Sequence, residues 1–290
     1  MSVFGEFARD RVALAALAAL ALIVLSAALA PWISPQNPYD LAALDILDSK
    51  LAPGAKGAGG ATYWLGTDEQ GRDMLSAILH GLRVSLAVGA AATLAALALG
   101  AAVGLTAAYA GGALDALLMR LADLQLSFPS ILIALVLMAV AGQGADRIVL
   151  ALIAVQWAYY ARTARGAALA ELRKEYVDAA RVMAFGAPRI VLRHVLPNVA
   201  PPLTVVATVQ VAHAIVLEAT LSFLGLGLPI TEPSLGLLVA NGFAHLLSGR
   251  YWISFYPGVA LLLVIVAINL VGDRLREVLD PHLAGHLRVR

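Results

Sequence analysis

Two titratable side chains stand inside an apolar segment of the sequence, where a charge is costly. Glu218 lies near the end of segment 198–223, and His213 precedes it by five residues. An ionised side chain at bilayer depth costs about 2.5–3.5 kcal/mol on insertion scales, so we expect Glu218 to face neighbouring helices or a cavity. A carboxylate and an imidazole at this depth could relay protons. They could instead be polar groups that hydrogen-bond to neighbouring helices, as we expect of Gln210 and Asn269.

Residues and motifs that several enzyme classes need are missing from the sequence. It has no cysteine, and its lysines are Lys50, Lys56 and Lys174. None of these lysines completes the phosphate-binding motif G-x-x-x-x-G-K-[ST], and no H-E-x-x-H zinc motif occurs. The basic and aromatic residues do not form a pattern suited to nucleic acid. We therefore expect a protein that is not itself an enzyme and that holds no cofactor or metal ion.

Long apolar segments position these residues. Hydrophobic residues make up 61% of the 290 residues and charged residues 13%, far from the composition of a soluble globular protein. A stretch of about 20 apolar residues is long enough to cross a bilayer as a helix. The sequence predicts an all-α integral membrane protein with six transmembrane helices, at residues 12–31, 84–108, 127–142, 146–165, 198–223 and 252–271.

Basic residues gather in one loop, residues 171–198, between the fourth and fifth predicted helices. Short loops rich in Lys and Arg stay in the cytoplasm, so this loop sets the orientation of the chain. With six helices, both termini then lie in the cytoplasm, and loops 32–82 and 228–250 lie outside. The basic residues in or just before the loop are Arg162, Arg165, Arg173, Lys174, Arg181, Arg189 and Arg193.

This basic loop contains the pattern of a short amphipathic helix. Gly186 and then Pro188 give a helix stop signal. The helix could rest on lipid headgroups, or it could dock in a groove of a soluble partner, and the spacing alone leaves both open. The residues of its contact face, at spacings of three and four, are Leu172, Tyr176, Ala179, Ala180 and Met183.

The predicted external loop contains an ordered polar motif from Trp64 to Asp73. Thr67 or Asp68 can cap the N-terminus of an interfacial helix that runs toward the second span. We favour this structural role for the acidic residues over a catalytic one. The chain then divides into residues 1–31 (cytoplasmic N-terminal segment and first helix), 32–82 (external loop with interfacial helix), 83–283 (five-helix core) and 284–290 (cytoplasmic tail).

Several motifs resemble those of a known family. EYVDAAR at 175–181, followed by HVLPN at 194–198, resembles the EAA loop of bacterial ABC importer permeases. Further motifs within residues 63–283 are similar to the permeases of dipeptide, oligopeptide and nickel importers, and more narrowly to their C-type (DppC/OppC-like) inner-membrane subunit. These motifs are LGTDEQGRDMLS, GGALDALLMRLADLQLSFP, LSFLGLG and NLVGDRLREVLDP.

The resemblance implies a MetI-like permease bundle in which the amphipathic helix is a cytoplasmic coupling helix. Such a subunit would pair with a second homologous permease and dock two ATP-binding subunits, which would carry the ATP and Mg. An external substrate-binding protein would deliver peptide to it. The residues implied in ATPase coupling are Glu175, Tyr176, Ala179, Ala180, Arg181, Met183 and Gly186, and the pore-lining candidates are Gln210, His213, Glu218 and Asn269.

One position departs from the family pattern. The family usually places Gly nine residues after the Glu, where this chain has Ala184. Because Gly186 follows two positions later, we expect the turn after the helix to be displaced by two residues. The closing Leu196-Pro197 is intact, so we expect coupling to be retained.

The sequence thus predicts a transmembrane permease subunit of an ATP-driven importer in the bacterial cytoplasmic (inner) membrane. Peptides are the expected cargo by resemblance, and nickel or another small solute stays open. The alternative from a different class is an ion-coupled secondary transporter that uses Glu218 and His213. Such transporters often contain internal repeats, and the sequence has no convincing repeat.

Overall fold

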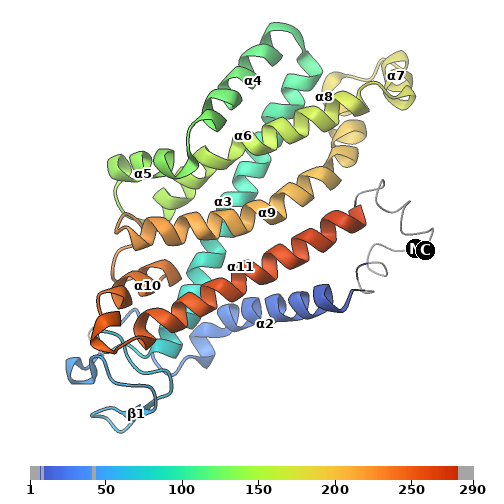
Figure 1. The fold of residues 1–290 in the computed structure, drawn as a ribbon. Helices are drawn as coiled ribbons and strands as arrows, with labels where there is room; N and C mark the ends of the chain where they lie inside the picture. Colours follow the sequence, from blue (N-terminus) through green and yellow to red (C-terminus); the bar gives the residue numbers. More distant parts are fainter. Residues whose placement is uncertain (1–6, 8–9, 41–43, 280–290) are drawn as a thin grey trace.

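The computed structural model is a helical bundle in which α2, α6, α9 and α11 run roughly side by side and α3 crosses them (Figure 1). It describes Phe7 and residues 10–40 and 44–279, so the predicted tail 284–290 and most of the N-terminal segment before Asp10 lie outside the described residues. The long helices are α2 (Arg11–Ile33), α3 (Met74–Ala110), α4 (Gly112–Ser127), α5 (Ser130–Ala141), α6 (Ala145–Glu171), α9 (Leu196–Phe223) and α11 (Trp252–Leu279).

Short elements connect the long helices. At one end of the bundle lie η2 (Ile46–Asp48), the two-stranded antiparallel pair β1 (Ala55–Lys56) and β2 (Thr62–Tyr63), α10 (Leu235–Phe243) and η4 (Leu246–Ser248). At the other end lie α7 (Glu175–Val182), α8 (Ala187–Arg189) and the π-helical turn η3 (Ile190–Val195). Figure 1 also places the start of α2 and the end of α11 at the end that carries α7.

Each of the six predicted membrane segments contains helix. Within the described residues, four helices are long and apolar enough to cross a membrane: α2, α3, the continuous run Ala187–Phe223, and α11. The pair α4 and α5, bent by 90° at Phe128-Pro129, would make a fifth as one broken span. Helix α6 is long but less apolar, with Asp146 and Arg147 at one end and Arg162 and Arg165 toward the other. The all-α membrane architecture is therefore confirmed, with four or five apolar spans.

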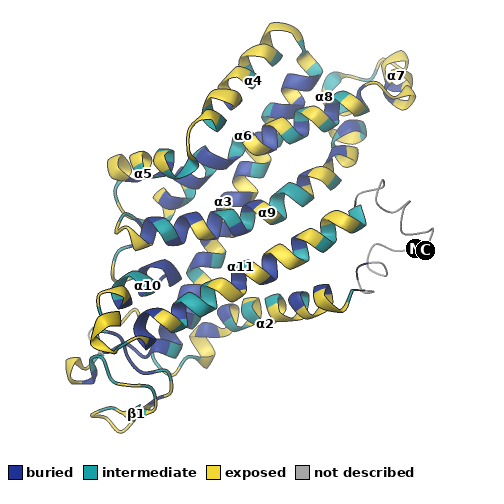
Figure 2. Ribbon diagram, in the orientation of Figure 1, coloured by how far each residue is buried: buried dark blue, intermediate teal, exposed yellow. Residues whose placement is uncertain are grey.

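The outward surface of the bundle is that of a membrane protein. Figure 2 shows exposed residues along the outer sides of α2, α4, α5 and α11. Many of these are large and apolar: Leu22 is 69% exposed, Val140 85% and Leu262 57%. Soluble monomers rarely expose contiguous apolar surface on this scale, whereas hydrocarbon is a suitable solvent for it.

Close packing of α3 against α6 holds the centre of the bundle. The two glycines of a G-x-x-x-G pattern, Gly100 and Gly104, lie directly against the backbone carbonyls of Trp157 and Ala161. A Cβ at either glycine would collide with those carbonyls. Small residues allow this approach between helices in lipid, where packing and not water expulsion drives association.

Helix α3 begins earlier and ends later than the span predicted at residues 84–108. Its N-cap is Asp73, whose carboxylate accepts from the backbone N–H of Ser76 at 2.8 Å. The prediction of Thr67 or Asp68 as the cap is therefore wrong, because both side chains are used within the preceding loop. The helix is continuous through the predicted boundary between residues 82 and 83, so within the described part of the loop no separate interfacial helix precedes the span.

Candidate functional site

Helix α7 is an amphipathic helix fastened to the bundle by its inner face. Lys174 is its N-cap, and Glu175 is its first residue. Val177 and Ala180 are buried on the inner face. They join an apolar cluster with Ile190, Val195, Val199 and residues of α3 and α6. The inner face of α7 is thus part of the same core as the long helices.

The outer face of α7 presents exposed apolar side chains among charged ones. Val182 is 86% exposed and Met183 59%, while Tyr176 is 37% exposed. The predicted contact face is split, since Leu172 and Ala180 pack inward whereas Tyr176, Ala179 and Met183 do not. The reason is that α6 ends at Glu171 and α7 starts only at Glu175, so Leu172 does not share the helical register of α7.

Charged residues flank this outer face in local pairs. Arg181 contacts Asp178 at 2.8 Å, as their spacing predicts, but Lys174 contacts Glu171 at 2.6 Å and not Asp178. Glu175 and Arg181 are exposed at the two ends of the helix. The outer face therefore presents two apolar side chains in a charged and solvated surround.

The turn after α7 is at Ala184. Its φ is +56°, and the N–H groups of Ala184 and Phe185 bond back to the carbonyls of Arg181 and Ala180 at 2.9 and 3.1 Å. These two bonds are a Schellman motif with Ala184 in the position that Gly usually occupies. Gly186 has φ −64°, an ordinary conformation for any residue. The expected displacement of the turn to Gly186 is therefore wrong, because the hydrogen bonds hold it at Ala184.

Aromatic and cationic groups hold the segment after the turn. The guanidinium of Arg189 lies 4.0 Å from the ring centroid of Phe185. The imidazole of His194 stacks with Phe185, with centroids 5.9 Å apart. Such a cation–π contact adds roughly 0.5–1 kcal/mol at an exposed site. The backbone between α7 and α9 is consequently well packed despite its short elements.

A polar contact joins α7 to its neighbours. The hydroxyl of Tyr176 donates to Oε2 of Glu171 at 2.6 Å and accepts from Nδ2 of Asn198 at 3.2 Å. Burial and this carboxylate raise the pKa of Tyr176 to about 12, because both disfavour the phenolate. Tyr176 thus touches the end of α6 and the start of α9 at once.

Two ion pairs fix α4 to α6 near the same end. Arg165 holds Asp115 with both of its forked nitrogens, at 2.5 and 2.6 Å. Arg162 lies 3.2 Å from Asp123. Arg162 and Arg165, the two basic residues that stand just before the loop 171–198, are therefore each paired with a carboxylate of α4.

Of the four pore-lining candidates, Gln210, His213 and Glu218 lie on α9 and Asn269 lies on α11. The carboxylate of Glu218 is fully buried and accepts from the hydroxyls of Ser85 and Ser222, each at 2.8 Å. Within the described residues, Nδ1 of His213 is buried without a hydrogen-bond partner. Asn269 is exposed on α11. The Glu218 oxygens are held by hydroxyls of α3 and α9, and no bond joins Glu218 to His213 in that part of the chain.

A groove lies beside α9, on the side of the end that carries α7. Its volume is about 620 Å³, and it opens between α6, α9 and α11. Gln210 lines it, and the backbone carbonyl of Gln210 accepts from Nε2 of Gln156 at 3.1 Å. The other lining residues are Tyr159, Thr163, Pro201, Pro202, Val205, Val206, Val209, Arg276 and Leu279.

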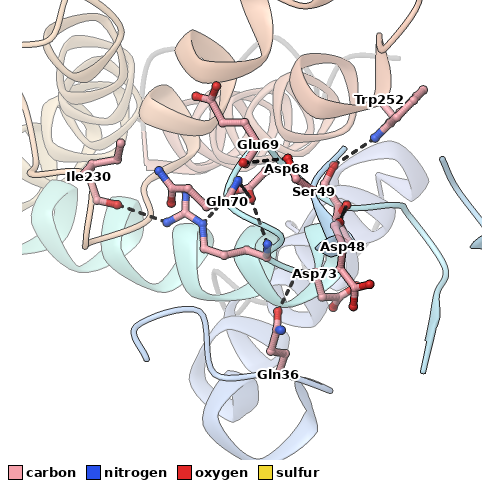
Figure 3. A network of polar contacts seen from close by, with 11 residues as sticks. Gln36, Asp48, Ser49, Asp68, Glu69, Gln70, Asp73, Ile230 and Trp252 are labelled. Carbon is pink, nitrogen blue, oxygen red and sulfur yellow. Dashed lines mark hydrogen bonds and ion pairs between the residues drawn. The ribbon is translucent and has the colours of Figure 1, made fainter. Parts of the chain in front are cut away.

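At the opposite end, a buried polar network shapes the loop before α3 (Figure 3). Arg72 is fully buried, contacts Asp68 at 2.6 Å and donates to the carbonyl of Ile230 at 3.2 Å. The indole of Trp252 donates to the carbonyl of Thr67 at 3.2 Å. The network therefore ties this loop to α11 and to the segment before α10.

The sequence alone did not reveal this network. Its charged residues have the spacing of an ordinary polar loop, and the dense motif LGTDEQGRD was its one signal. Asp48, also buried, accepts from the hydroxyl of Tyr63 at 2.8 Å, and burial together with this carboxylate raises the pKa of Tyr63 to about 12. The acidic residues of the loop serve structure.

Comparison with known proteins identifies the family. Residues 96–285 match the family described as binding-protein-dependent transport system inner membrane component. The chain belongs to this family. Residues 2–53 also match the N-terminal transmembrane domain of oligopeptide transport permease C, which covers α2 and the start of the following loop.

Individual members of the family are similar over nearly the whole chain. The di/tripeptide transport system permease protein DppC of Pseudomonas aeruginosa is 38% identical, over 96% of this chain and 90% of its own length. The dipeptide transport system permease protein DppC of Escherichia coli K12 is 39% identical, over 96% and 91%. The probable D,D-dipeptide transport system permease protein DdpC of the same strain is 35% identical, over 92% and 86%.

A solved structure has the same fold. The inward-facing methionine ABC transporter MetNI contains a chain that superposes with a TM-score of 0.58, covering 71% of this chain and 98% of that one. The two sequences are 18% identical, so this likeness concerns the fold. The permease chain described here thus has a MetI-like bundle, and α7 lies inside the part that the family model matches.

Proposed function

We propose that this chain is one of two permease subunits of an ATP-driven importer of di- and oligopeptides. The names of its most similar relatives support the cargo, since these are permeases for dipeptides and tripeptides. ATP and Mg bind to partner ATPases, and a substrate-binding protein delivers the peptide. The chain supplies half of the translocation path and a coupling helix, α7.

The observation that carries this proposal is the outer face of α7. A helix that merely rested on lipid would bury its apolar side chains in the membrane interface, at the level of neighbouring helix ends. Helix α7 is short and lies at the extremity of the bundle (Figure 1). Val182 and the C-cap residue Met183 are exposed there, close in the chain to the ion pair of Arg181 and Asp178. A small exposed apolar surface on a helix whose inner face is well packed fits a helix-in-groove contact with a soluble partner.

The topology of the proposal has six spans, with α6 as the fourth. Both termini and α7 lie in the cytoplasm, and the loop before α3 lies outside. Two observations support this topology. The basic loop contains α7. The start of α2 at Arg11 and the end of α11 at Leu279 lie at the end of the bundle that carries α7. Residues 1–31, 32–82, 83–283 and 284–290 keep their predicted roles as N-terminal unit, external loop, core and tail.

The coupling residues divide into two groups. Glu175, Ala179, Arg181 and Met183 face outward and would touch the ATPase, whereas Ala180 packs inward and Tyr176 joins α7 to its neighbours. Gly186 starts the segment that leads back to α9. Gln210, His213, Glu218 and Asn269 stay candidates for the path, with Gln210 favoured by its place in the groove.

Purification of the tagged chain from its native membrane in mild detergent tests the assembly. Mass spectrometry should identify a second permease and one or two P-loop ATPases in the purified complex. The proposal is contradicted if the chain is recovered alone and peptide uptake persists after ATP depletion but collapses with the proton gradient. That outcome would support the ion-coupled alternative.

A further inference from the structure

The contact between Tyr176 and Asn198 lies where three helices meet. Asn198 Nδ2 donates to the Tyr176 hydroxyl at 3.2 Å and to the backbone carbonyl of His194 at 2.8 Å. The hydroxyl donates to Glu171, the last residue of α6, at 2.6 Å. One tyrosine on α7 is therefore bonded to the end of α6 and to the beginning of α9.

A π-helical turn presents Asn198 and the His194 carbonyl on the same side. In η3 the N–H of Leu196 bonds to the carbonyl of Val191, five residues back. Pro197 has no N–H, so in an α register the carbonyl of Arg193 would lack its helical donor. The wider π register accommodates this missing donor, and π turns recur at functional positions.

Apolar contacts support the same junction from behind. Val177 and Ala180 of α7 pack with Ile190, Val195 and Val199, which belong to η3 and to the first turn of α9. A displacement of α7 that left α9 in place would break both this packing and the hydrogen bonds of Asn198. The lower-energy response is for the two helices to move together.

Helix α9 then leads into the interior of the bundle. It runs without interruption to Phe223 and carries Gln210, at the groove, and Glu218, bonded to α3. We propose that Tyr176 and Asn198 are positioning residues that join α7 to α9, so that α7 and the first turn of α9 move as one body. This inference rests on the proposed function and adds the route by which movement enters this chain.

Replacing the two side chains tests the joint in the complete transporter. Tyr176→Phe removes the hydroxyl, and Asn198→Ala removes the amide. Tyr109→Phe is the matched control, because Tyr109 packs against the same apolar cluster at the end of α3 but is not part of the contact. The complex with its ATPases is reconstituted in proteoliposomes, and dipeptide imported per ATP hydrolysed is measured.

We expect each variant to hydrolyse ATP at the wild-type rate while importing less peptide per ATP. Loss of one neutral hydrogen bond shifts an equilibrium by about two- to tenfold, so Asn198→Ala should lower the ratio by that factor. Tyr176→Phe also loses the bond to the Glu171 carboxylate and should lower the ratio at least as far, whereas Tyr109→Phe should leave it unchanged. The double variant should import about as much peptide per ATP as the more impaired single variant, because both substitutions act through one contact. Equal thermal unfolding midpoints for Tyr176→Phe and Tyr109→Phe would separate the effect from a loss of stability.

Two results distinguish the failure of this inference from failure of the proposed function. If the wild-type complex imports no peptide with ATP, the proposed function is wrong. If the wild type imports peptide and both variants keep its ratio of peptide imported to ATP hydrolysed, movement does not pass from α7 to α9 through Tyr176 and Asn198. A variant that lowers ATP hydrolysis and import in proportion would also overturn the inference, since coupling would then be intact.

Discussion

The N–H of Phe185 donates to the carbonyl of Ala180 at 3.1 Å, and this bond holds Ala184 in a left-handed conformation. A left-handed conformation costs a residue with a Cβ about 1–2 kcal/mol. The family's usual glycine would avoid that cost. The turn is thus at the position where the family usually has glycine, although this chain has Ala184 there.

Ala184→Gly should therefore stabilise the protein by about 1 kcal/mol, less the added entropy of the unfolded chain. Gly186→Ala is the matched opposite, because Gly186 has φ −64° and its nearest neighbour to a new Cβ is Pro188 Cδ at 3.9 Å. We expect that variant to be neutral or slightly stabilising. Thermal unfolding in detergent measures both. Destabilisation by Ala184→Gly together with damage by Gly186→Ala would place the turn at Gly186.

Adjacent alanines on α7 should respond differently to a carboxylate. Ala180 is 1% exposed within the apolar cluster, whereas Ala179 is exposed. Ala180→Asp buries an unpaired polar group, so we expect it to lower the free energy of unfolding by roughly 1–3 kcal/mol and to loosen α7. Ala179→Asp should leave stability unchanged and weaken association with the ATPase. Limited proteolysis and co-purification separate the two effects, and identical behaviour of the variants would contradict the assigned faces.

The carboxyl of Glu218 should be replaceable by an amide. Its two oxygens accept from Ser85 and Ser222, and a glutamine can keep one of these contacts while its amide donates to the other hydroxyl. Glu218→Gln should import peptide at a near wild-type rate, whereas Glu218→Leu should unfold at a lower temperature because it leaves buried hydroxyls unpaired. Uptake assays at several pH values check this. Loss of uptake in Glu218→Gln, with dependence on a proton gradient, would favour the ion-coupled alternative.

The buried pair of Arg72 and Asp68 should be important for stability. Arg72→Met leaves a fully buried carboxylate without its partner, which costs about 3–5 kcal/mol. The added change Asp68→Asn should restore part of this loss. Arg162→Met is the matched control, because the pair of Arg162 and Asp123 is half exposed and should contribute less than about 1 kcal/mol. Equal unfolding midpoints for Arg72→Met and Arg162→Met would contradict the structural role of the network.

The sequence was most informative where a repeating pattern decides the structure. The spacing along 175–183 predicts the helix, and the apolar segments predict the long helices. The pair Gly100 and Gly104 stands among many other small residues in the sequence and lies against α6 in the structure. Its partner could not be identified before the fold was known, because small residues allow many pairings.

Features that depend on tertiary contacts were not predictable. Alanine rarely adopts a left-handed conformation, so the sequence favoured Gly186 as the turn residue. The backbone hydrogen bonds of the turn show that the left-handed residue is Ala184. The inner face of α7 depends on where the helix starts, which is set by the break after Glu171. The burial of Arg72 depends on Ile230, which is 158 residues away in the sequence.

Docking of the outer face of α7 on an ATPase subunit can be tested directly, because the chain contains no cysteine. Single cysteines are introduced by Met183→Cys and, at the opposite end of the bundle, by Leu47→Cys, whose parent side chains are 59% and 81% exposed. Each variant complex is treated with a short thiol-to-amine cross-linker and analysed by mass spectrometry. We predict an adduct between residue 183 and an ATPase subunit and none from residue 47. Absence of an adduct at residue 183, in a complex that still imports peptide with ATP, would contradict docking through the outer face of α7.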